Sequence, residues 1–322
     1  MNNIEKPNNL KKVRIVVVIA VSIILLTSLS GCINDSGDGS NDGEEDGSTW
    51  NAYEFEGTVE PAEGDSGELK EYTFEETYNE NGTIKRFEVQ VTVLGKEEAN
   101  MPVEKIDPTT GQSEKIDQTL NCYKLEHHIE VLQDDEGLDH PDWAEVTVYI
   151  PVDEYDSSDA SPYFGIYSRM DYEDSDGNEG MWSYHLTEEM KEKQQNQEAY
   201  YSPYTEGESH QYDNWVLHGM YGWAWTWFRP FAEDTQFSEG EASVSTGPGS
   251  YSYSVEKTTE NVSGYEFTAW DVSCSAVTFE GGGSLEGTFS TSLPVPIYLK
   301  VGGGDQQHYS YYEVELMSVT LE

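Results

Sequence analysis

The sequence predicts a mainly β protein (β-rich α+β): an antiparallel twisted sheet or half-barrel with a helical insertion at about residues 187–231. Three observations predict this fold class. Apolar and polar residues alternate with a period of two over many segments, which is typical of strands that bury one face. An asparagine–glycine turn signal joins two of these segments. Aromatic residues make up 12% of the chain, whereas disordered chains contain few of them.

The first apolar segment, Ile15 to Leu26, follows a cationic stretch and ends close to Leu29-Ser30-Gly31-Cys32. A basic start, a short apolar run and small residues at a cut site are the features of an export signal. The run is also shorter than the roughly 20 apolar residues that a membrane span needs. An uncleaved anchor helix is the alternative interpretation.

This segment resembles the signal peptide and lipobox of exported lipoproteins. The resemblance covers residues 1–31 and Cys32. It implies cleavage after Gly31, a lipid on the sulfur of Cys32, and a mature chain held at the outer face of the cytoplasmic membrane.

The residues after Cys32 are expected to form a tether and then an ectodomain. Residues 32–50 are rich in Gly, Ser, Asn, Asp and Glu, which predicts a flexible, self-repelling linker. Residues 51–322 would form the β-rich ectodomain. Its segments 51–180 and 235–322 share an order of strand, turn, long strand and cysteine, so they could be two similar halves.

Strands are predicted in order from Leu69. The first hairpin turns at Asn81-Gly82, where a strand ending after Tyr72 and Phe74 meets one that alternates from Phe87 to Val93. The other strands are expected at about 105–117 (a hairpin), 123–131, 146–150, 164–170, 251–272 (with a turn at Asn261-Gly264) and 311–321.

The alternation breaks at Thr187, which is a good N-cap for the helix-forming residues Glu188 to Gln197. A loop is expected at Ser202-Pro203. The aromatic stretch from Trp215 to Phe231 favours a second helix over a strand. Its large aromatic residues are either core or a ligand-binding surface, and the binding candidates are Trp215, Tyr221, Trp223, Trp225 and Trp227.

The charge of the chain excludes some partners. The net charge is −45, and residues 1–31 carry four basic side chains but one acidic one, so the mature part is still more acidic. Such a chain repels nucleic acid and anionic lipid headgroups. We expect counter-ion cations as partners, membrane attachment through the lipid on Cys32, no nucleic acid and no cofactor. A protein or glycan partner is left open.

The remaining cysteines and three sequons are candidate modification sites. With Cys32 lipidated, Cys122 and Cys274 form an even pair in an oxidising compartment, which makes them a candidate disulfide. Asn-x-Ser/Thr sequons predict glycosylation candidates at Asn34, Asn81 and Asn261.

Metal and catalytic motifs are weak. Asp174, Asp176 and Asn178 alternate as in a calcium loop, but Tyr172 and Ser183 stand where that loop has its first and last ligands. An acidic hairpin tip is therefore preferred. Glu126, His128 and Glu130 share a strand face and could meet a metal, although alternating polar groups are typical of any exposed strand face. Gly64-Asp65-Ser66-Gly67 lacks the histidine segment of serine proteases and is interpreted as a turn.

The sequence thus favours a lipid-anchored, non-catalytic surface or binding protein. The first alternative is a binder of glycans or apolar ligands through the Trp-rich stretch. The second is a secreted glycan-acting hydrolase that uses two of the many carboxylates.

Overall fold

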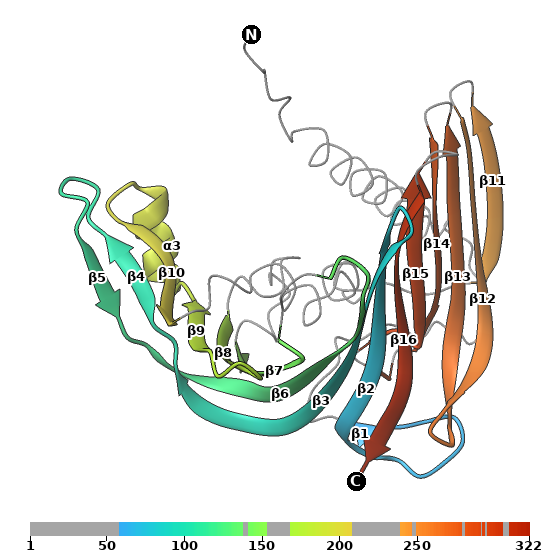
Figure 1. The fold of residues 1–322 in the computed structure, drawn as a ribbon, viewed down its shortest axis with the longest axis horizontal. Helices are drawn as coiled ribbons and strands as arrows, with labels where there is room; N and C mark the ends of the chain where they lie inside the picture. The colour runs from blue at the N-terminus through green and yellow to red at the C-terminus, as the bar shows by residue number, and fades with distance from the viewer. Residues whose placement is uncertain are drawn as a thin grey trace, which may run out of the picture.

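The protein folds as one open, curved antiparallel sheet. The computed structural model describes residues 58–137, 141–152, 168–207, 239–246, 249–278, 281–290, 292–293, 295–304 and 309–322. Within these ranges, sixteen strands belong to a single sheet that does not close on itself. The sheet bends so that its two ends rise on the same side (Figure 1). The predicted mainly β fold class is confirmed.

The strands fall into two runs along the chain. The first run contains β1 (Thr58–Val59), β2 (Gly67–Glu80), β3 (Thr83–Asn100), β4 (Val103–Ile106), β5 (Ser113–Ile116), β6 (Thr119–Asp134), β7 (Trp143–Pro151), β8 (Ser168–Asp174), β9 (Glu179–Tyr184) and β10 (Tyr200–Gly207). The second run contains β11 (Gly240–Thr246), β12 (Gly249–Val262), β13 (Tyr265–Thr278), β14 (Gly281–Phe289), β15 (Tyr298–Gly304) and β16 (Tyr309–Leu321).

One strand pair joins the two runs. The order across the sheet is β11-β12-β13-β14-β15-β16-β2-β3-β6-β7-β8-β9-β10-β4-β5, with β1 beside β2. The C-terminal strand β16 therefore pairs with β2, placing Tyr312 opposite Tyr78 and Leu316 opposite Phe74. Both predicted halves continue through this seam into the same sheet (Figure 1).

The two long hairpins turn where the sequence predicts. Asn81 and Gly82 between β2 and β3 have φ of 56° and 91°. Ser263 and Gly264 between β12 and β13 have φ of 53° and 90°. Two successive residues with positive φ form the tight turn that matches the twist of antiparallel strands. The predicted hairpin around 105–117 is also confirmed, as β4 and β5.

The first helix of the predicted insertion is shorter than expected, since it ends at Gln195 instead of Gln197. Helix α3 (Glu188–Gln195) begins after Thr187, whose side chain accepts a hydrogen bond from the Met190 N–H. The predicted loop at Ser202-Pro203 is wrong, because both residues belong to β10. Tyrosine and threonine favour strands, and Pro203 lies where β10 changes partner from β4 to β9. Residues 208–238, which include the Trp-rich stretch, lie outside the described ranges.

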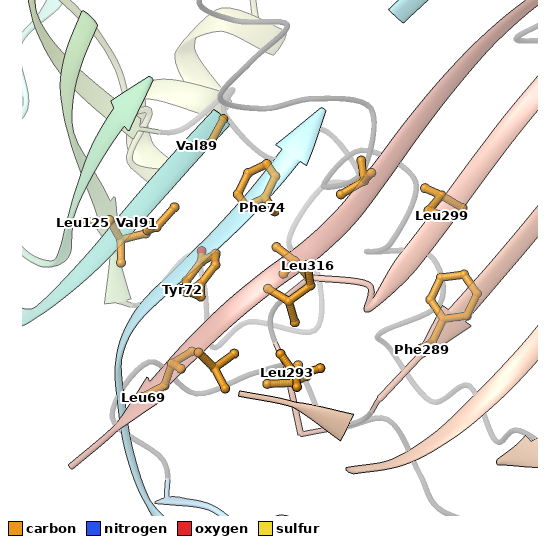
Figure 2. Close-up of a cluster of buried hydrophobic side chains, with 14 of the residues drawn as sticks. Leu69, Tyr72, Phe74, Val89, Val91, Leu125, Phe289, Leu293, Leu299 and Leu316 are labelled. Carbon is orange, nitrogen blue, oxygen red and sulfur yellow. The ribbon is translucent and has the colours of Figure 1, made fainter. Parts of the chain in front are cut away.

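The core lies on one face of the sheet, which we call the buried face. Alternate residues of β2, β3 and β6 occupy it, as the period of two predicts. Figure 2 shows that side chains from both sides of the β2–β16 seam point into this cluster, including Leu69, Tyr72, Phe74, Val89, Val91, Leu125, Phe289, Leu299 and Leu316. Leu293, between β14 and β15, is fully buried in the same cluster.

Strand β13 buries residues of both alternations. The sequence left Trp270 and Val272 open as alternatives on the strand with Phe267 and Ala269, and all four are buried. The segment after β1 pairs with the start of β13 through Glu63 and Glu266.

A glycine on the buried face gives a test of this packing. A Cβ at Gly287 would lie 2.5 Å from Cζ of the buried Phe289 ring, and enlarging a packed core costs about 1–3 kcal/mol. We therefore expect Gly287→Ala to lower the urea midpoint of unfolding. Gly240→Ala is the matched control, because no atom lies within 4 Å of its Cβ. Equal effects of the two substitutions would contradict this packing.

Candidate functional site

The outer face of the sheet carries a row of glutamates that lie directly opposite one another. Glu315 on β16 pairs with Glu75 on β2, Glu75 pairs with Glu88 on β3, and Glu88 pairs with Glu130 on β6. We call these four residues the glutamate row. Their strand neighbours Phe74, Phe87, Ile129 and Val314 are buried, so alternation turns the four carboxylates to the opposite face.

A second acidic row continues along the sheet. Glu145 on β7 pairs with Glu173 on β8, which pairs with Glu179 on β9. The end of the glutamate row meets this second row, because Glu130 is opposite Trp143 and His128 is opposite Glu145. Carboxylates thus follow one another across most of the strands between β16 and β9.

Like charges in this arrangement are costly. Directly opposite residues have Cβ atoms about 4.5–5.5 Å apart, and like charges at that spacing destabilise a sheet. The repulsion is about 1 kcal/mol per pair in bulk water and larger near a protein surface. Arg86 offsets part of it, since its Nε lies 3.4 Å from a carboxylate oxygen of Glu75.

Lys300 and His128 also lie beside acids and aromatic rings. Lys300 lies 2.8 Å from Glu313 and 4.1 Å from the centre of the Tyr311 ring. His128, which faces Glu145 at 3.6 Å, stacks on Trp143 with ring centres 5.9 Å apart. The outer face therefore has a strong excess of negative charge along the two rows.

The buried face contains one carboxyl group that the sequence analysis missed. Glu76 is 1% exposed and accepts hydrogen bonds from the phenol groups of Tyr78, at 3.2 Å, and Tyr312, at 2.9 Å. Burial raises the pKa of Glu76 well above its usual range, although the two phenols lower it in part. The carboxyl therefore tends to keep its proton when the chain folds. The alternation from Tyr72 and Phe74 already placed Glu76 on this face.

His127 is the basic counterpart on the buried face. It lies between Val91 on β3 and Val146 on β7, and burial lowers the pKa of its imidazole to about 4. The unfolded side chain would titrate near 6.5. Neutral His127 thus contributes stability at neutral pH that is lost as the pH falls from 6.5 toward 4, by up to about 3 kcal/mol.

The weak calcium candidates lie in the β8–β9 turn, where Asp174 caps the backbone. One oxygen of Asp174 accepts hydrogen bonds from the N–H groups of Asp176, at 2.9 Å, and Asn178, at 3.0 Å. The other accepts the phenol of Tyr172 at 2.7 Å. The side-chain amide of Asn178 adds contacts to both oxygens. Protein donors thus surround this carboxylate, which fits a hairpin turn better than a cation site.

Glu126, His128 and Glu130 share the outer face of β6, as their spacing predicts. They alternate there with buried Leu125, His127 and Ile129. Within the described ranges, no group of three or more His, Cys, Asp or Glu side chains is arranged so that it could hold one metal ion.

The candidate disulfide is not formed. Cys122 and Cys274 are both free, buried thiols. Cys122 lies on β6 and Cys274 on β13, which are separated by β14, β15, β16, β2 and β3 in the sheet. Cys274 belongs to the main core, whereas Cys122 packs in a small second cluster with Ala99 and Met101. Burial raises the pKa of the two thiols to about 12 and about 11, respectively.

Several predicted residues lie outside the described ranges. They are Cys32, Asn34, Trp215, Tyr221, Trp223, Trp225 and Trp227. The sequons at Asn81 and Asn261 are described and lie at the two long hairpin turns.

Comparisons with known protein families, with curated proteins and with solved structures find no match to this chain. Among the described elements, no helix is long and apolar enough to cross a bilayer. What the geometry defines is a one-sheet protein with an apolar buried face and an acidic outer face.

The buried carboxyl group predicts a specific pH dependence. Because the pKa of Glu76 is raised on folding, its contribution to stability is full below about pH 4.5 and is lost as the pH rises, by about 1.4 kcal/mol for each unit that the folded pKa exceeds that value. Glu76→Gln removes this loss while keeping a group that can bond both phenols. We expect similar urea unfolding free energies at pH 4 and a more stable Glu76→Gln variant at pH 8.

The control for this measurement is Glu98→Gln, an exposed glutamate on β3 that faces Asn121. It is expected to leave the pH profile of unfolding nearly unchanged. A Glu76→Gln variant that is less stable than wild type at pH 8 would show that the ionised carboxylate is the favoured form.

Proposed function

We propose that this chain is a lipid-anchored extracytoplasmic protein that acts as a non-catalytic surface or binding module, with counter-ion cations held along its acidic outer face. The observation that carries the proposal is the glutamate row, in which Glu315, Glu75, Glu88 and Glu130 face one another across four strands.

The energetic cost of the row supports a role for cations. In each of the three adjacent glutamate pairs, the two carboxylates repel each other by about 1 kcal/mol or more. A sheet needs no acid at these outer positions in order to fold, since threonine or glutamine would serve there without repulsion. Cations that gather along the two rows offset the cost, and they would let the face meet a cationic or cation-bridged partner.

The sequence supports the anchor and the distance from the membrane. A lipid on Cys32 would hold the chain, and the acidic linker 32–50 would keep the sheet roughly 25 Å or more from the bilayer on a random-coil estimate. An acidic face cannot approach anionic headgroups closely without screening. Such a linker therefore lets a lipid-anchored chain keep its acidic sheet away from the bilayer.

Two alternative functions stay predictions. Binding of a glycan or apolar ligand depends on the Trp-rich stretch, which lies outside the described ranges. Glycoside hydrolysis depends on a carboxylate pair about 5–10 Å apart in a cleft, and the residues for it are not assigned.

The anchor is tested by changing its acceptor atom. Wild type is expected in the membrane fraction with a mature N-terminus at Cys32 that carries lipid mass. Cys32→Ser removes the sulfur and is expected to release the chain from the membrane or leave its signal uncleaved. Cys122→Ser is the control, since a buried thiol has no part in anchoring. Recovery of wild type with an intact Met1 and no lipid would refute the proposal.

The cation face is tested by neutralising the middle of the row. Glu88 has a glutamate on each side, so Glu88→Gln is expected to stabilise the fold by about 1–2 kcal/mol at low salt. The gain should vanish near 1 M NaCl, where the screening length of about 3 Å is shorter than the spacing of the row. Magnesium chloride should stabilise wild type more than sodium chloride of equal ionic strength.

Glu98→Gln on the same strand is the matched control, because Glu98 faces Asn121 instead of an acid. It should change stability by a few tenths of a kcal/mol and keep the response to magnesium. A Glu88→Gln variant with wild-type salt and magnesium dependence would count against the cation face while leaving the anchor intact.

A further inference from the structure

The two long hairpins are capped in the same way. In the β2–β3 turn, the side-chain oxygen of Asn79 accepts a hydrogen bond from the Gly82 N–H at 2.9 Å. In the β12–β13 turn, the side-chain oxygen of Asn261 accepts one from the Gly264 N–H at 3.2 Å. Each turn thus follows the pattern Asn-x-x-Gly, with positive φ at its last two residues.

The two sequons occupy different positions of the Asn-x-x-Gly turn. In Asn81-Gly82-Thr83 the acceptor asparagine is the third residue of the Asn-x-x-Gly turn, and the capping role belongs to Asn79. Asn81 is exposed. In Asn261-Val262-Ser263 the acceptor asparagine is itself the cap.

The hydroxyl groups of the two sequons also differ in their hydrogen bonding. Ser263 Oγ accepts a hydrogen bond from the Val319 N–H at 3.0 Å, which ties the β12–β13 turn to β16. Thr83 is the first residue of β3 and is partly exposed. In the second sequon, the side chains of Asn261 and Ser263 both accept hydrogen bonds from backbone N–H groups. Asn81 and Thr83 of the first sequon do not make the corresponding bonds.

N-glycosyl transfer needs both side chains at once. The asparagine Nδ2 attacks the anomeric carbon of an oligosaccharide carried on a lipid diphosphate, so a C–N bond forms as the C–O bond to the diphosphate breaks. The diphosphate leaves with the electron pair, and the amide proton passes to an enzyme base. The transferase also binds the Ser/Thr hydroxyl, so a sequon with engaged side chains must first break those bonds.

From this contrast we infer that Asn81 is the sequon of the folded sheet that accepts an oligosaccharide and that Asn261 is not. Open space does not distinguish the two turns, since no atom lies within 4 Å of a Cβ built at Gly82 or at Gly264, so the contrast rests on the two hydrogen bonds. The two sites lie at opposite ends of the long strands, because Glu80 pairs with Ser310 at the start of β16 whereas Ser263 bonds Val319 near its end. A glycan on Asn81 would project from one rim of the sheet.

The experiment compares the folded and the unfolded full chain as acceptors. Each form is incubated with a purified oligosaccharyltransferase and its lipid diphosphate-linked oligosaccharide, and occupancy is measured by mass spectrometry of the peptides. In the folded chain, occupancy at Asn81 is expected to exceed that at Asn261 by on the order of tenfold or more, since two hydrogen bonds oppose the second site. In the unfolded chain the ratio is expected to approach one.

Two variants serve as controls. Asn81→Gln should abolish transfer to the folded sheet, apart from any at Asn34, and Asn261→Gln should leave it unchanged. Circular dichroism checks that both retain the wild-type sheet. A folded chain modified equally or preferentially at Asn261, or unmodified at Asn81, overturns the inference. Either outcome is independent of lipidation at Cys32 and of the cation face.

Discussion

The apolar side chains on the buried face determine where everything else on the sheet lies. A shift of one residue in any strand would turn its core residues outward, so the register is strongly fixed wherever one face is buried. With Phe74, Val89, Ile129 and Val314 buried, the outer positions next to them must line up across the strands. The glutamate row is therefore a consequence of the core. Once the apolar residues occupy the buried face, alternation puts the carboxylates between them on the outer face.

The same constraint explains why Glu76 and His127 differ from the outer acids. They occupy buried-face positions of β2 and β6, where water cannot solvate a charge, and their pKa values move in the directions that favour the neutral forms. Their effects on stability oppose each other as the pH changes. The contribution of His127 is lost as the pH falls below about 6.5, whereas that of Glu76 is lost as the pH rises above about 4.5. The combined contribution of these two groups to stability is therefore largest at intermediate pH.

Local sequence signals predicted the local features well. Asn81-Gly82 and Thr187 are at the turn and the N-cap where the sequence places them, because the residues that form these features are neighbours in the chain. The loop predicted at Ser202-Pro203 is wrong because proline usually marks a loop. The change of partner along β10 that accommodates Pro203 depends on distant strands.

Features that depend on pairing between distant strands could not be predicted. The glutamate row requires the registers of β16, β2, β3 and β6 together, and Glu315 is far from Glu75 in the sequence. The separation of Cys122 from Cys274 likewise depends on the order of strands across the sheet. The capping role of Asn261 could have been suspected, since Asn79 and Asn261 both stand three residues before a glycine.

The pairing of β16 with β2 has a consequence for biosynthesis. The hydrogen bond from Tyr312 to Glu76 joins residues that are 236 positions apart, so this seam cannot form before the residues of β16 have been synthesised. Contacts of such long range slow folding and keep strand edges open until the end. The sheet therefore stays incomplete until the residues of its last strand have been synthesised. Until β16 is present, one edge of β2 stays open and Glu76 lacks the hydrogen bond from the phenol of Tyr312.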